Sequence, residues 1–340
     1  MRPLLLQGHE RAITQIKYNR EGDLILTAAK DNKPNIFFSA NGERLGNLIG
    51  HNGAVWCIDV NWDSTRIITG GGDGQLKLWD LETGACISTI DNTTSARTCA
   101  FSYSGRYVMY STDNTMGKDC EIRIIDFNDP QQVAGHGLMK TSVCTSTQKG
   151  KVTAALWWNL DDGILTGHED GSLCIWDLRN DLDKIQRVKA HRGIINDMQY
   201  NKDSTMVITA SKDNSAIVFD SDTLEELKKF PTERPVNSAA ISPIFNHVLL
   251  GGGQEAREVT VTSAKQGKFD ARFYHLIFEE EFGRVKDHFG PINSVAFHPD
   301  GKSYASGGED GFVRVHHFDQ TYFELTFEGE DFTPLEGGNY

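Results

Sequence analysis

One spacing rule recurs five times along the 340-residue sequence. At each site a Ser or Thr lies four residues before an Asp, and an aromatic residue or His lies six residues after that Asp. In four of the five sets a His stands at one constant interval before the Asp, whereas the third set has Gln148 at that position. The sets are Thr27/Asp31/Phe37 with His9, Thr69/Asp73/Trp79 with His51, Thr166/Asp170/Trp176, Thr209/Asp213/Phe219 with His191, and Ser306/Asp310/His316 with His288. Recurrence of this kind is typical of a chain built from repeated structural units.

The intervals between the five Asp residues predict seven units. The interval from Asp31 to Asp73 is almost the same as that from Asp170 to Asp213. The two remaining intervals, from Asp73 to Asp170 and from Asp213 to Asp310, equal each other and are more than twice as long. Each therefore has room for one further unit without the motif. These two degenerate units are expected at 97–127 and 236–261.

Each unit has the pattern of four short strands separated by turns. In the second unit, runs rich in Val, Ile, Thr and aromatic residues alternate with Asn-Trp-Asp-Ser, Gly-Asp-Gly and Glu-Thr-Gly turns. The expected strands are 55–60, 66–71, 75–80 and 86–90. The stretch GHNGAVWCIDV…GGGDGQLKLWD (50–80) resembles the WD40 repeat, in which one unit forms one propeller blade. We therefore expect an all-β fold, a seven-bladed WD40 β-propeller.

A propeller also has to close, because an open ring would expose an edge strand. Leu4–Leu6 stand before the first Gly-His pair as Leu48-Ile49 stand before the second, in the place of an outer, fourth strand. We therefore expect the N-terminal strand to complete the last blade, with Tyr322–Phe327 as the competing segment. The propeller should span 1–327 as a single domain, followed by an acidic, Gly-rich and flexible C-terminal tail over 328–340.

Composition argues against several classes of function. The net charge is −13, whereas a nucleic-acid groove is usually basic, so direct DNA binding is not expected. No apolar run approaches the roughly 18 residues needed to cross a membrane. The six cysteines form no CxxC pair, which favours small buried side chains in a reducing, cytoplasmic compartment over a disulfide framework or a zinc site. We expect no metal and no other cofactor.

His288, Ser306 and Asp310 look like the triad of a hydrolase. The chain carries four near-copies of this set, however, whereas catalysis needs one. Buried polar groups must be paired, so we interpret the sets as hydrogen-bond networks that tie each blade together, and we expect no enzymatic activity. The predicted network residues are His9, Asp31, His51, Thr69, Asp73, Trp79, Thr166, Asp170, Trp176, His191, Thr209, Asp213, His288, Ser306 and Asp310.

Three other groups of residues are interpreted as having no role in a network or in a binding site. Gly135-His136 and Gly167-His168 have no Asp at the matching interval after the His, so we expect neither to join a network. His316 and His317 are adjacent in a strand and point to opposite faces, which disfavours a metal site. The acidic run 279–281 is expected to be solvated.

The stretch GKFDARFYHLIFEEEFGRVKDHFGPIN (267–293) joins the sixth unit to the seventh. We predict Phe273–Phe278 as the outer strand of blade six, with apolar residues on both faces. An outer strand normally keeps one face polar, so this pattern predicts cover by a partner protein. The candidate contact residues are Phe273, Tyr274 and Leu276.

Blade five carries two Asp residues in turns that should share one rim. In a four-stranded meander, the first-to-second and third-to-fourth turns lie on the same side. Asp203 and Asp220 occupy these two turns, with Val218 one pleat away. The Asp pair is either ordinary and solvated, or an acidic seat for an Arg or Lys of a partner helix. The second hypothesis makes all three residues partner-binding candidates.

Several segments have a more specific resemblance. GGGQEAREVT, GKFDARFYHLIFEEEFGRVKDHFGPIN, YASGGEDGFVRVHHF and the initial LLLQGHERAITQIKYN resemble the i subunit family of eukaryotic translation initiation factor 3. The resemblance covers essentially the whole chain. It implies a non-catalytic scaffold that binds the b and g subunits of that factor and supports recruitment of mRNA and initiator tRNA to the small ribosomal subunit. The alternative is a WD40 adaptor in another assembly, such as a ubiquitin-ligase substrate receptor, which would be expected to carry a basic or aromatic-lined pocket on the Gly-His face.

Overall fold

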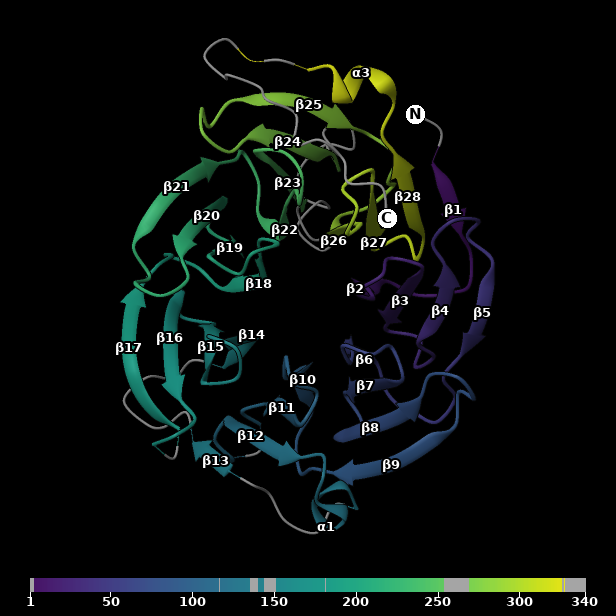
Figure 1. Cartoon of the computed structure of the whole chain (residues 1–340), viewed down its shortest axis with the longest axis vertical. Coiled ribbons are helices and arrows are strands. Elements are labelled where there is room, and N and C mark those ends of the chain that lie inside the picture. The colour runs from purple at the N-terminus through teal and green to yellow at the C-terminus, as the bar shows by residue number, and fades with distance from the viewer. Residues whose placement is uncertain are drawn as a thin grey trace.

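Seven four-stranded sheets are arranged as the blades of a ring, with the first strand of each blade towards the centre (Figure 1). The computed structural model describes residues 3–115, 117–134, 140–143 (backbone only), 151–180, 182–253, 269–325 and 327. The predicted all-β, seven-bladed propeller is confirmed. Among the described residues, two short helices accompany the sheets, α1 (Pro130–Val133) and α3 (Gln320–Phe323). No helix in this part of the chain is long and apolar enough to cross a membrane.

Blades one to six are antiparallel meanders of four consecutive strands, and blade seven is antiparallel with one strand from the start of the chain. Blade one contains β2 (Ile13–Tyr18), β3 (Leu24–Ala29), β4 (Asn35–Phe38) and β5 (Arg44–Asn47). Blade two contains β6 (Val55–Val60), β7 (Arg66–Gly71), β8 (Gln75–Asp80) and β9 (Cys86–Asp91), as predicted to within one residue. Blade three contains β10 (Ala96–Phe101), β11 (Tyr107–Thr112), β12 (Glu121–Asp126) and β13 (Lys140–Val143). Blade four contains β14 (Val152–Trp158), β15 (Gly163–His168), β16 (Ser172–Asp177) and β17 (Asp183–Lys189).

The remaining three blades follow the same order. Blade five contains β18 (Ile195–Tyr200), β19 (Met206–Ser211), β20 (Ser215–Asp220) and β21 (Glu226–Pro231). Blade six contains β22 (Val236–Ile241), β23 (His247–Gly252), β24 (Ala271–His275) and β25 (Glu281–Val285). Blade seven contains β26 (Ile292–Phe297), β27 (Ser303–Gly308), β28 (Val313–His317) and, from the other end of the chain, β1 (Leu4–Leu6).

The N-terminal strand closes the ring. β1 lies beside β28 (Figure 1). The two strands are antiparallel, with Leu5 opposite Arg314 in the register. Leu6 is only 1% exposed and lies in the core between blades seven and one. The described residues of the competing segment Tyr322–Phe327 do not pair with this edge. Its first two residues belong to α3, where the Tyr322 ring stacks on Phe318 and its hydroxyl lies 2.8 Å from His247 Nδ1 of blade six. The tail 328–340 lies outside the described residues.

Each pair of neighbouring blades shares one apolar core. Seven clusters of buried residues occur in the described part of the chain, and each joins the faces of two adjacent blades. The second and third strands are therefore largely buried on both faces, as the uninterrupted burial of the second strands β3 and β15 and of the third strand β24 illustrates. Burial of apolar area is the main favourable term in folding, so the ring is stabilised mostly at its blade interfaces.

A second set of contacts lines the central channel. The inner strand of every blade has a register shift at its second residue. At five of these seven positions, a Thr or Asn side chain donates to the carbonyl of the first residue of the next inner strand, as Asn293 does to Ile13 O at 2.9 Å. The other two positions hold Trp56 and Arg97. The Arg97 guanidinium lies 4.5 Å from the centroid of the Trp56 ring. A β-bulge interrupts the alternation of side chains between the two faces of a strand and re-aims the bulged side chain. This change of direction makes the ring of contacts between inner strands possible.

Blade six differs from its prediction. Phe273–Phe278 was expected to be the outer strand, but β24 is the third strand and β25 is the outer one. Residue 275 pairs with His247 of β23, and residues 254–268 between these strands lie outside the described part. A third strand is packed between two neighbouring blades, so apolar residues on both of its faces need no partner protein. The prediction of partner cover over this strand is therefore wrong.

The closure makes a testable prediction about stability. Leu6→Ala should lower the free energy of unfolding by about 2–4 kcal/mol, because it leaves a cavity in the core between blades seven and one. Leu5→Ala on the same strand is the matched control, because Leu5 is 42% exposed and its loss should have a small effect. Urea unfolding of both variants measures the difference. Equal midpoints would contradict this view of the closure.

Candidate protein-binding surfaces and buried networks

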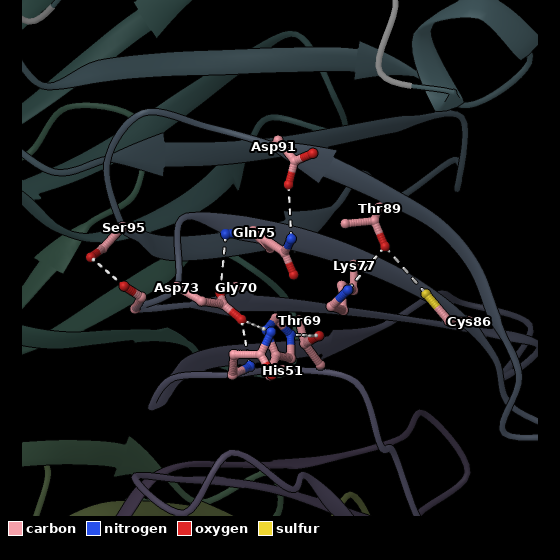
Figure 2. Close-up of polar contacts among 12 residues, drawn as sticks. His51, Thr69, Gly70, Asp73, Gln75, Lys77, Cys86, Thr89, Asp91 and Ser95 are labelled. Atoms are coloured by element: carbon pink, nitrogen blue, oxygen red, sulfur yellow. Dashed lines mark hydrogen bonds and ion pairs between the residues drawn. The ribbon is translucent and has the colours of Figure 1, made fainter.

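Blade two contains the most complete buried network (Figure 2). Trp79 Nε1 donates to Thr69 Oγ1 at 2.8 Å, and the same oxygen lies 2.7 Å from His51 Nε2. His51 Nδ1 lies 2.9 Å from Asp73 Oδ2. An indole N–H can only donate and a carboxylate can only accept, so the Thr69 hydroxyl donates to Nε2 and the Nδ1 proton faces the carboxylate. The four side chains of this network are then hydrogen-bonded one to the next, from Trp79 through Thr69 and His51 to Asp73.

Glycine is needed next to this network. A Cβ atom at Gly71 would lie 2.3 Å from Asp73 Oδ1 and 2.6 Å from His51 Nδ1. At Gly308, in the equivalent place of blade seven, it would lie 2.5 Å from His288 Nδ1. All three distances are shorter than real contacts allow, so packing against the imidazole explains why Gly stands two residues before each of these Asp residues.

Blades one, five and seven repeat the arrangement. In each, the His Nε2 atom meets a buried hydroxyl and the His Nδ1 atom meets an Asp. The first pairs are His9–Thr27 at 2.7 Å, His191–Thr209 at 2.7 Å and His288–Ser306 at 2.9 Å. The second pairs are His9–Asp31 at 2.7 Å, His191–Asp213 at 3.0 Å and His288–Asp310 at 3.2 Å. Thus four blades share one geometry.

Blade four builds its network differently. The position of the missing His, Gln148, lies outside the described residues. His168 takes its place on Thr166, whose hydroxyl lies 3.0 Å from His168 Nε2 and accepts from Trp176 Nε1 at 2.7 Å. Asp170 instead contacts Ser172 and Arg187. The prediction that His168 joins no network is wrong, and the missed signal was local: residues two apart in a strand share a face.

Burial determines the protonation of these networks. Loss of hydration lowers the pKa of His51 and of His191 below the usual value, so the imidazoles stay neutral. Burial alone would raise the pKa of Asp73, but the Asn52 N–H and His51 outweigh it and hold that pKa below its usual range. The hydroxyl of Thr69 is fully buried. A hydroxyl in that position does not meet an external substrate, and we interpret the sets as structural.

The Gly-His face opens on a cavity at the mouth of the channel. Its volume is about 660 Å³, and Lys30, Trp56, Arg97 and Lys151 contribute to its wall. It therefore has the basic and aromatic lining expected of a WD40 adaptor. Its cations are already paired, because Arg97 and Lys151 both contact Asp113 at 3.0 Å, and Lys30 contacts a Glu of blade seven.

Metal and disulfide chemistry find no support in the described residues. No group of three or more His, Cys, Asp or Glu side chains there is arranged to hold a metal ion. His316 is buried and stacks on Tyr304, whereas His317 on the other face is exposed. Five of the six cysteines are described, all of them free thiols; four are buried as predicted, but Cys86 is exposed.

The candidate contact residues of blades five and six fall into two groups. Val218, Phe273, Tyr274 and Leu276 are each at most 8% exposed and lie in the blade interfaces, so they support the surface from below and do not form it. Asp203 is exposed and Asp220 half-buried, in the two turns predicted for them. The Asp220 carboxylate accepts the Thr223 N–H at 2.9 Å and the Asp222 N–H at 3.0 Å, which lowers its pKa.

The exposed apolar residues of blade six lie just beyond the predicted ones. Ile277 is 47% exposed and Phe278 is 40% exposed, in the turn between β24 and β25. Lys228 Nζ of blade five binds Ile277 O at 2.8 Å and Glu279 at 3.1 Å, which joins the outer turns of the two blades. The acidic run is therefore not simply solvated, since Glu281 also pairs with Arg284.

Comparison with known proteins assigns the chain to a family. The EIF3I family model matches residues 1–328. Eukaryotic translation initiation factor 3 subunit I of Bombyx mori is 60% identical over 330 residues, covering 96% of this chain and 99% of that protein. The subunit I proteins of Drosophila willistoni and Culex quinquefasciatus are each 59% identical, over 95% and 96% of this chain and 100% of their own length.

The chain belongs to the EIF3I family. The resemblance inferred from the sequence is thereby confirmed, and the repeat, the networks and the closing strand described above are those of one EIF3I chain. A role in translation initiation follows from this membership.

The blade-two network of this EIF3I chain makes a prediction about stability. Asp73→Ala should lower the free energy of unfolding by about 1–3 kcal/mol, because it leaves the His51 imidazole and the Asn52 N–H without their acceptor. Asp63→Ala, in an exposed turn of the same blade, should be close to neutral. Chemical unfolding compares the two. A midpoint for Asp73→Ala equal to that of the parent chain would show that the network contributes nothing.

His316 makes a prediction about pH. Burial lowers its pKa to about 4, against about 6.5 for an exposed His, although Asp287 at 3.4 Å partly opposes the shift. Because the folded pKa is depressed, the unfolded chain binds the proton more readily. Stability is therefore complete above pH 6.5 and is lost as pH falls towards 4, by up to about 3 kcal/mol.

Substitution isolates this contribution from other titrating groups. His316→Gln should show a smaller loss of unfolding free energy between pH 7 and 4 than the parent chain. His317→Gln should keep the parental slope, because His317 is exposed. If the parent chain and His316→Gln lose stability in parallel over this range, the buried neutral state of His316 is wrong.

Proposed function

We propose that the chain is a non-catalytic scaffold subunit of eukaryotic translation initiation factor 3. In this role it binds the b and g subunits and supports recruitment of mRNA and initiator tRNA to the small ribosomal subunit, in the cytoplasm. The observation that carries the proposal is the match over nearly the whole chain to proteins named as subunit I of that factor. The buried hydroxyls of the repeated networks support a structural use of their His and Asp residues.

We place the contact with subunit b on the rim of blades five and six. Asp203 and Asp220 supply negative charge there, and Ile277 and Phe278 supply exposed apolar surface. An amphipathic helix with an Arg or Lys beside an apolar anchor fits this combination. The competing interpretation is that both Asp residues are ordinary turn residues, which the Asx-type bonds of Asp220 would equally explain.

A second candidate function rests on one observation, the cavity on the Gly-His face. Its lining of Trp56, Arg97 and Lys151 is what an adaptor in another assembly, such as a ubiquitin-ligase substrate receptor, would use. The pairing of both cations with Asp113 weighs against it, because a ligand would have to compete with that carboxylate.

Affinity purification of the tagged full-length chain, followed by mass spectrometry, separates the two functions. Recovery of the other subunits of the initiation factor is the expected result. Recovery of ubiquitin-ligase components without those subunits would overturn the scaffold proposal.

Charge reversal tests the position of the contact. Asp203→Lys/Asp220→Lys should weaken binding of the subunit b C-terminal segment at least tenfold, since desolvated charge pairs are frequent hot spots. Glu43→Lys/Glu82→Lys makes the same change of charge in exposed turns of blades one and two and should bind normally. Circular dichroism establishes that both double variants are folded, and titration calorimetry measures affinity. Unchanged affinity of the first variant places the contact elsewhere.

A further inference from the structure

Three consecutive blades present side chains on their first turns that contact one another from blade to blade. The Arg20 guanidinium of blade one lies 3.9 Å from the ring centroid of Trp62 in blade two. The Trp62 ring lies 4.4 Å from the ring of Tyr103 in blade three. Trp62 is nevertheless 38% exposed and Tyr103 is 52% exposed. Large aromatic rings on turns are not required by blade packing, so their exposure needs another explanation.

The next blade extends the row with a strained turn. Asn159, Leu160 and Asp161 have φ values of 46°, 48° and 78°, a left-handed conformation that costs roughly 1–2 kcal/mol per non-glycine residue. The result is that Leu160 is 70% exposed. Asp161 accepts the N–H groups of Tyr103 at 2.6 Å and Ser104 at 2.9 Å, which fixes this turn to that of blade three. Strain that displays an apolar residue is found at functional surfaces more than elsewhere.

The four turns are also held in place. Asn19 Nδ2 of blade one contacts Ser64 Oγ of blade two at 3.1 Å, and His298 of blade seven contacts Gly22 O at 2.9 Å. The row Arg20, Trp62, Tyr103 and Leu160, which we name the aromatic platform, is therefore fixed before any partner arrives. A preformed surface loses little conformational entropy on binding.

The charged residues around the aromatic platform indicate which class of partner it would bind. Glu21 and Asp63 are exposed beside Arg20 and Trp62, and within the described part of the chain neither makes an ion pair. The whole chain carries a net charge of −13. Aromatic rings stack on nucleic-acid bases, but phosphates would be repelled here, so RNA is disfavoured. A basic peptide would be attracted, and its apolar side chains would cover the rings.

We propose that the aromatic platform is a second docking surface, which binds a basic, apolar segment of another protein of the same assembly. It lies on blades one to four, apart from the rim of blades five and six. The inference rests on the proposed function, because the assembly is the one proposed there. Two separate surfaces would let the propeller hold two partner chains at once, which is what a scaffold requires.

Hydrogen exchange on the reconstituted factor tests the docking directly. The full-length chain is measured alone and after incorporation with the other subunits. The platform turns, covered by peptides over 19–23, 61–65, 102–105 and 159–162, are expected to exchange more slowly in the assembly. The protection should persist after nuclease treatment. Protection that disappears with the nuclease would assign the platform to RNA and overturn the proposal.

Substitutions provide the second arm of the test. Trp62→Ala/Tyr103→Ala and Glu21→Lys/Asp63→Lys should each weaken retention of at least one subunit tenfold or more, the charge variant most clearly at low salt. Phe289→Ala is the control, because Phe289 is 86% exposed and follows His288 on the opposite rim. If the chain joins the factor but the platform variants behave like the control and exchange is unchanged, the inference fails alone. If the parent chain joins no subunit, the proposed function fails and the inference with it.

Discussion

The pairing of β1 with β28 is the contact on which the rest of the structure depends. It joins Leu4 to Val315, so the two ends of the chain meet in one sheet. Without it, blade seven would have an open edge, and the core between blades seven and one would lose Leu6. Each blade packs on its two neighbours. The apolar cores therefore lie between successive blades around the ring, and they do not merge into one central core. The bulge side chains of the inner strands add a polar connection from blade to blade around the channel.

Because the ring is closed, we infer that partner recognition depends mainly on residues in the turns. The His, Asp, Ser and Thr side chains that would be most suggestive of catalysis are hydrogen-bonded to one another inside the blades. Neighbouring blades cover most of the second and third strands, whereas outer strands such as β5, β9, β17 and β21 stay largely exposed. The side chains at the rims are accessible too, and these differ from blade to blade: Asp203 and Asp220 on blade five, Trp62 and Tyr103 on blades two and three. An identical frame can thus carry several different surfaces.

The repeat explains both what the sequence predicted well and what it did not. The blade count, the strands of blade two and the closing strand follow from spacing and alternation, which are local properties of the chain. The strand assignment in blade six was wrong for two reasons. Residues 254–268 interrupt the spacing of the repeat. Apolar residues on both faces of Phe273–Phe278 also suit a strand packed between two blades as well as a covered outer strand. His168 was missed because the spacing rule looked for a His only at one fixed interval before the Asp. The ring of contacts at the bulges and the contacts of Arg20 and Tyr103 with Trp62 join different blades, and no pattern within one blade reveals them.

We propose that this EIF3I chain acts as a scaffold through its rims, with its buried networks serving only the fold. Cryo-electron microscopy of the assembled factor is the decisive experiment, because it shows where partner chains contact the propeller. We expect a partner helix on the rim of blades five and six, near Asp203, Asp220 and Phe278, with the channel mouth near Trp56 and Arg97 unoccupied by partner chains. A partner segment bound in the channel mouth, with the rim of blades five and six facing solvent, would contradict it.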